Sequence, residues 1–164
     1  MKDCIFKELL YKAIGVANKK LEGGILIVGK RGKLKELLRC TSSHYTGIVD
    51  INTSLKITDL SIYEFTSLVS PEGATFITPQ GEILARALDV RGKTSLLSFL
   101  LSLLESLAKK QKIKIGTGGT KHKAARELSK YLKEEGFIMS ISAEERITLY
   151  HNGNEYSIEK YFKL

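Results

Sequence analysis

The sequence predicts an α/β fold, in which helices flank a mixed central β-sheet, and three observations lead to this class. Apolar residues recur at helical spacing in some segments and form short buried runs in others, and the two kinds alternate along the chain. The 164 residues contain only two prolines and no low-complexity tract, so no linker divides them. A hydrophobic fraction of 43% can build one core. We therefore expect a single domain over residues 1–164.

The elements expected in the first part of the chain are a helix at 5–19, a strand at 25–28, a basic helix at 33–40, a strand at 46–51 and a helix ending at Val69. Gly23 and Gly24 end the first helix, and the apolar run after them is typical of a buried strand. Either Asp59 or Ser61 could cap the last helix, and Pro71 stops it.

The elements expected after it are hairpin strands at 73–78 and 82–90, a leucine-rich helix at 95–108, a strand at 112–115, a glycine-rich loop at 116–120, a helix at 121–135, and strands at 137–141 and 146–150. Pro79-Gln80-Gly81 forms the first hairpin turn, and Asn152-Gly153 is a second turn signal. Gly136 is expected to end the helix before it.

Several classes of protein are disfavoured. The leucine-rich segment 95–108 is too short to cross a bilayer and carries Glu105, so we expect core packing or a subunit contact instead of a membrane span. Cys4 and Cys40 lack metal-type spacing, which favours a reduced, cytoplasmic protein. The net charge of +8 favours the binding of polyanions. Because the lysines are spread along the chain, a dedicated nucleic-acid surface is the less favoured hypothesis.

The glycine-rich loop at 116–120 leads into a helix that opens with Lys121, His122 and Lys123. Cations are disfavoured at this position, because the first helical turn already presents free N–H groups and the positive end of the dipole. A phosphate among these groups would relieve the repulsion, and a glycine-rich loop lets backbone N–H groups approach it. The alternative, a solvated lysine pair on a surface helix, stays open on these grounds.

A second candidate phosphate loop covers 87–94 and ends in Gly-Lys-Thr before a helix. Ala87 stands where that motif needs its first glycine, and Asp89 and Arg91 suit a phosphate-wrapping backbone poorly. A nucleotidase that uses Lys93 therefore remains only an alternative.

Four segments in chain order resemble the diadenylate cyclase domain family, of the DisA N-terminal type. They are the strand 24–29, Glu72-Gly73-Ala74, the segment Gly-Thr-Lys-His-Lys-Ala-Ala at 119–125, and Ile-Ser-Ala-Glu-Glu at 141–145. The resemblance implies condensation of two ATP molecules into cyclic di-AMP with release of two pyrophosphates. It also implies a homodimer or larger homo-oligomer in which two protomers face each other, and a divalent metal, Mg²⁺ or Mn²⁺.

The resemblance also implies the roles of individual residues. Glu72 would be catalytic, activating the ribose 3′-hydroxyl, and Glu72, His122 and Glu144 are the implied metal ligands. The implied nucleotide contacts are Gly73, Val90 with Leu88 beside it, Thr120, Lys121, His122, Lys123, Ala124 and Ser142.

The chain departs from the family pattern at three of these positions. Glu72 replaces an aspartate, and the longer side chain moves the carboxylate by one methylene. Lys121 and Lys123 replace arginines, and lysine lacks the planar guanidinium that binds phosphate through two donors. ATP binding tolerates such changes better than catalysis does. An ATP-binding or sensing module with weakened catalysis is therefore the alternative function.

Overall fold

The computed structural model describes residues 3–18, 24–42, 48–50, 55–69, 74–87, 121–142 and 147–158. In these residues one seven-stranded sheet has the order β2-β4-β3-β1-β5-β6-β7. Its strands are β1 (Gly24–Gly29), β2 (Ile48–Asp50), β3 (Ala74–Ile77), β4 (Ile83–Ala87), β5 (Gly136–Ile141), β6 (Ile147–His151) and β7 (Asn154–Ser157). β1 and β3 are parallel, whereas the other neighbouring pairs are antiparallel. The expected mixed sheet is confirmed.

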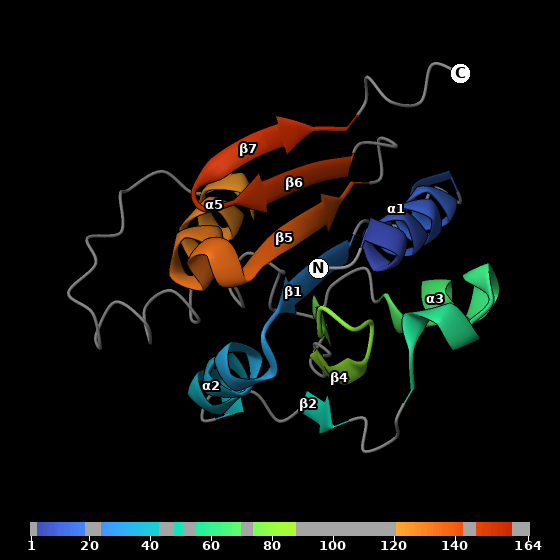
Figure 1. Cartoon of the computed structure of the whole chain (residues 1–164), viewed down its shortest axis with the longest axis horizontal. Coiled ribbons are helices and arrows are strands. Elements are labelled where there is room, and N and C mark those ends of the chain that lie inside the picture. Colours follow the sequence, from blue (N-terminus) through green and yellow to red (C-terminus); the bar gives the residue numbers. More distant parts are fainter. Residues whose placement is uncertain are drawn as a thin grey trace.

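Helices cover both faces of this sheet, so the fold has three layers (Figure 1). On one face lie α1 (Asp3–Asn18), the 3-10 turn η1 (Ile57–Asp59) and α3 (Ile62–Leu68). On the other face lie α2 (Arg31–Ser42) and α5 (Lys121–Leu132), which continues into the 3-10 turn η2 (Lys133–Glu135). None of the described helices is long and apolar enough to cross a bilayer.

The central strand β1 supplies the core on both faces. Ile25 and Ile27 pack into the cluster under α2 and α5, while Leu26 and Val28 pack into the cluster under α1 and α3. All six residues of β1 are buried. Each fully buried aliphatic side chain contributes about 1.5–3 kcal/mol. The apolar run that predicts a buried strand therefore also marks the middle layer of the molecule.

The expected helix at 121–135 is confirmed in extent, but its last turn is a 3-10 helix. α5 ends at Leu132, and the chain leaves it through η2, where Lys133 has a φ of 52°. Gly136 is extended, with a φ of −176°, and begins β5. A Cβ at this position would lie 2.2 Å from the carbonyl oxygen of Val28. Gly136 thus directly follows the last helical residue, as expected, and the close approach of two strands at this position also requires a glycine.

The other expected elements within the described residues are confirmed to within a few residues, and β7 is an addition. Asn152 and Gly153 have φ angles of 48° and 80°, as a tight hairpin turn requires. All four residues of β7, which follows this turn, are exposed, so no apolar pattern announces the strand. The expected helix at 95–108, strand at 112–115 and loop at 116–120 lie outside the described residues.

Candidate functional site

One end of the sheet gathers several chain segments that are distant in sequence. Ala74, the first residue of β3, faces Ala87, the last residue of β4. On the other side of β1, Gly24 faces Ile141, the last residue of β5, and Ile141 faces Ile147, the first residue of β6. These five residues define what we call the Gly24 end of the sheet.

Most of the site residues expected from the sequence attach to this end. Glu72 and Gly73 immediately precede β3, Val90 follows β4, and Glu144 lies between β5 and β6, all four outside the described residues. Ser142 is described, half-buried, directly after β5. The sheet register therefore brings the attachment points of these segments together, and the positions of the four undescribed residues stay predictions.

The N-terminus of α5 is directed toward the same end. Residues 121–124 open this helix, of which the structure describes the backbone, and Thr120 lies just outside. At the other terminus, Leu132 contacts the positions of Gly29 and Gly136, where β1 ends and β5 begins. Because only η2 joins α5 to β5, the helix runs back along the sheet, antiparallel to β5. Its free N–H groups and positive dipole end are thus directed toward the Gly24 end.

Polar contacts hold α5 against the β6–β7 hairpin. Arg126 forms an ion pair of 2.7 Å with Glu155 on β7. The hydroxyl of Ser129 is fully buried and accepts a hydrogen bond of 3.0 Å from the backbone N–H of Gly153. These contacts, with the apolar face of the helix, fix the direction in which α5 presents its first turn.

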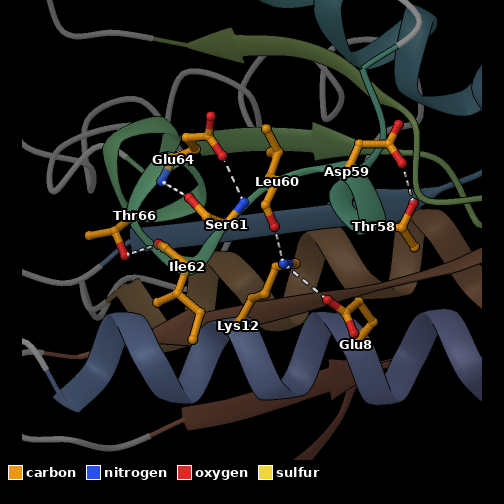
Figure 2. Close-up of polar contacts among 9 residues, drawn as sticks. All are labelled: Glu8, Lys12, Thr58, Asp59, Leu60, Ser61, Ile62, Glu64 and Thr66. Carbon is orange, nitrogen blue, oxygen red and sulfur yellow. Dashed lines mark hydrogen bonds and ion pairs between the residues drawn. The ribbon is translucent and has the colours of Figure 1, made fainter.

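A hydrogen bond joins the elements on either side of the segment 70–73, which contains Glu72 and lies outside the described residues. The hydroxyl of Thr75, on β3, donates a hydrogen bond of 3.3 Å to the carbonyl oxygen of Leu68, the last residue of α3. α3 itself begins with a capping box, in which Ser61 accepts from the N–H of Glu64, and the Glu64 carboxylate accepts from the N–H of Ser61 (Figure 2). The ends of the segment 70–73 therefore have a fixed separation.

Lys12, a buried residue of α1, connects this helix to the start of α3. The side chain of Lys12 is only 4% exposed, forms an ion pair of 3.0 Å with Glu8 and donates a hydrogen bond to the carbonyl oxygen of Leu60 (Figure 2). Leu60 directly precedes the Ser61 cap of α3. The contacts thus run from α1 through α3 to β3.

Sequence reasoning missed Arg86, which lies on β4 beside Thr75. Its Nε is buried and makes no hydrogen bond in the described part of the chain, and burial lowers the pKa of its guanidinium. A charged residue within the apolar run of Ile83–Ala87 was the available signal, because an arginine in a half-buried strand needs a partner.

One pocket formed by described residues lies at the opposite end of the sheet. It holds about 200 Å³ and is lined by Val28, Glu134, Glu135, His151 and neighbouring residues. The Glu134 carboxylate lies 3.4 Å from His151. The residues that line this pocket include two carboxylates and no lysine or arginine, so it does not suit a nucleotide. Within the described residues no three potential metal ligands form a cluster.

The fold, a mixed sheet between two helical layers, is similar to that of two solved structures. A solved structure of a double mutant of DacA from Staphylococcus aureus matches it with a TM-score of 0.55 and 16% identity, over 95% of this chain and 87% of that one. A hypothetical membrane-spanning protein from Bacillus cereus matches with a TM-score of 0.53 and 18% identity, over 94% and 63%. No protein-family model matches the sequence. No curated protein matches it either.

At these identities the likeness establishes the fold alone. It confirms, at the level of fold, the resemblance to diadenylate cyclase domains that the four sequence segments indicate.

Proposed function

We propose that this chain is a diadenylate cyclase that condenses two ATP molecules into cyclic di-AMP. The observation that carries the proposal is the convergence, at the Gly24 end of the sheet, of the strand ends that flank the family-like segments. The first turn of α5 is directed to the same end, and its free N–H groups suit phosphate. This convergence occurs in a fold like that of DacA.

In the proposed reaction two protomers face each other and each holds one ATP. The 3′-oxygen of each ribose forms a bond to the α-phosphorus of the opposite ATP, while the bond from that phosphorus to pyrophosphate breaks. Glu72 accepts the proton of the attacking hydroxyl. Lys121 and Lys123 neutralise phosphate charge, and Val90 packs against the adenine. Catalysis then rests on positioning and charge stabilisation, as phosphoryl chemistry generally does.

The proposed metal ligands fit a hard divalent cation. Glu72 and Glu144 attach to strand ends that meet at the Gly24 end, and His122 lies in the first turn of the helix directed toward it. Carboxylates together with substrate phosphates are the usual ligands of Mg²⁺, and an added imidazole also suits Mn²⁺. When bound, such an ion supplies charge neutralisation at the phosphates and lowers the pKa of a coordinated hydroxyl.

A second candidate function is ATP sensing without turnover, and the departures from the family motif favour it. The extra methylene of Glu72 displaces the carboxylate, and a misplacement of about 1 Å can slow a reaction by about a hundredfold. ATP binding depends less on that carboxylate than catalysis does.

The test is incubation of the purified chain with ATP and either Mn²⁺ or Mg²⁺, with chromatographic separation of the products. We expect cyclic di-AMP from the wild type and none from Glu72→Ala or Lys121→Ala. Lys35→Ala, which changes an exposed lysine on α2, should leave the yield unchanged. Tight ATP binding without product, and product restored by Glu72→Asp, would select the sensing module. A wild type that neither binds nor converts ATP contradicts both functions.

A further inference from the structure

We propose that Arg86 binds a phosphate group of the nucleotide held at the Gly24 end of the sheet. The proposal rests on the proposed function and adds to it a residue that no resembled motif contains. Arg86 is the one arginine of the described strands.

The register sets the position of Arg86. It faces Thr75 on β3 and Val49 on β2, one residue inward from Ala87 at the Gly24 end. Directly opposed residues of neighbouring strands point to the same face. Thr75 points toward α3, because its hydroxyl bonds to the carbonyl oxygen of Leu68. Arg86 therefore lies on the α3 face of the sheet, beside the hydrogen bond from Thr75 to Leu68, and one residue separates it from the Gly24 end.

The surroundings of Arg86 differ from those of two other described arginines. Arg31 and Arg126 each form an ion pair of 2.7 Å, with Glu82 and Glu155 respectively. Arg86 is half-buried, its Nε is shielded from solvent, and that atom has no hydrogen-bond acceptor in the described part of the chain. A buried donor left unsatisfied costs free energy, and this cost is removed when an anion arrives. Arg86 is thus prepared for an anionic ligand.

Phosphate is the anion that fits this position. A guanidinium presents a planar fork that holds two phosphate oxygens at once, and it stays charged even when burial lowers its pKa. The lysines at 121 and 123 stand where the resembled family has arginines, so this chain lacks two such forks there. Arg86 supplies one from β4, a different element on a different face of the sheet.

The experiment measures ligand affinity by calorimetry with three probes in the presence of Mg²⁺. They are an ATP analogue with a non-cleavable α,β-methylene bridge, inorganic tripolyphosphate, and adenosine. The variants are Arg86→Gln and Arg86→Lys, and Arg31→Gln is the matched control because Arg31 lies beyond the opposite end of β1. We expect Arg86→Gln to lower the affinity for the ATP analogue and for tripolyphosphate by about tenfold or more, and to leave the affinity for adenosine unchanged. The affinities of Arg86→Lys should lie between those of the wild type and those of Arg86→Gln. The affinities of Arg31→Gln should equal the wild-type values.

A second readout separates ligand binding from a structural role. Since Nε has no described partner, the melting temperature of ligand-free Arg86→Gln should equal or exceed that of the wild type. A clear fall would mean that Arg86 pairs with a carboxylate of its own chain, and would overturn the proposal. So would equal affinity of wild type and Arg86→Gln for the ATP analogue, which leaves the proposed function standing. Arg86-dependent binding of tripolyphosphate without binding of the ATP analogue supports the phosphate site and contradicts the proposed function.

Discussion

Replacing Lys12 by methionine tests whether its buried ammonium group holds α3 in place. Methionine keeps most of the aliphatic stem of Lys12, which is 4% exposed, so core packing changes little. The substitution removes the hydrogen bond to the Leu60 carbonyl and the ion pair with Glu8. Lys7→Met is the matched control, because Lys7 lies exposed on the same helix.

The expected magnitude follows from the two lost contacts. A hydrogen bond from a charged group contributes about 1.5–3 kcal/mol. The Glu8 carboxylate is 36% exposed, so its pair with Lys12 adds only about 0.3–0.5 kcal/mol, as other helical pairs at this spacing do. The free energy of unfolding should therefore fall by about 2–3 kcal/mol. For a chain of this size that lowers the melting temperature by about 4–12 °C.

The assay is thermal and urea unfolding followed by circular dichroism for wild type, Lys12→Met and Lys7→Met. We expect the full loss in Lys12→Met and almost none in Lys7→Met. Equal stability of the two variants would refute the reasoning, because it would show that the buried ammonium contributes no more than an exposed one. The affinity for ATP should also fall in Lys12→Met alone, since α3 is hydrogen-bonded to β3, the strand that follows Glu72 in the chain.

Other predictions concern close packing, a helix cap and pH. Gly136→Ala should destabilise the fold by about 3 kcal/mol or more, since the added Cβ would lie 2.2 Å from the carbonyl oxygen of Val28. Gly32→Ala should stabilise the fold by about 0.5 kcal/mol, because the added Cβ would lie in open space. Urea unfolding measures both changes. Ser61→Ala should lower the free energy of unfolding by about 1 kcal/mol, because it removes the N-terminal cap of α3. An unchanged midpoint of urea unfolding would contradict the role of the capping box. Burial raises the pKa of Tyr150 to about 12 from 10.0, so the stability that its protonated phenol provides below pH 10 is lost as the pH rises toward 12. Melting curves of Tyr150→Phe should lose this part of the pH dependence.

Local signals made the elements of this fold predictable. The run at 25–28 was apolar enough to predict a buried strand, and Ser61 followed three residues later by Glu64 is a capping-box sequence. The strand β7 was not predictable, because its exposed residues carry no pattern and it forms only by pairing with β6. The end of the helical run at Gly136 was predictable, but the close strand contact that also requires this glycine was not, because sequence alone does not show how near two strands come.

The residues of the candidate site stay predictions, and the arrangement of the strands beside them was not predictable from the sequence. The resemblance pointed to Glu72, Lys121 and Ser142 one segment at a time. That their flanking elements meet at one end of the sheet depends on register, which is set by contacts between distant strands. The unpaired state of the Arg86 Nε was not predicted, because local sequence does not show whether an arginine in a strand lies beside a carboxylate.

The position of β1 in the middle of the sheet has a consequence for how the chain folds. Its partners are distant in the sequence: Ile25 pairs with Ala74, and Gly24 pairs with Ile141. Closing such long loops is entropically costly and slows folding. On the ribosome, a nascent chain that has not yet reached Gly136 keeps one edge of this apolar strand unpaired. Such edges invite aggregation, so early intermediates of this protein are the species in which chaperones should find an exposed β1.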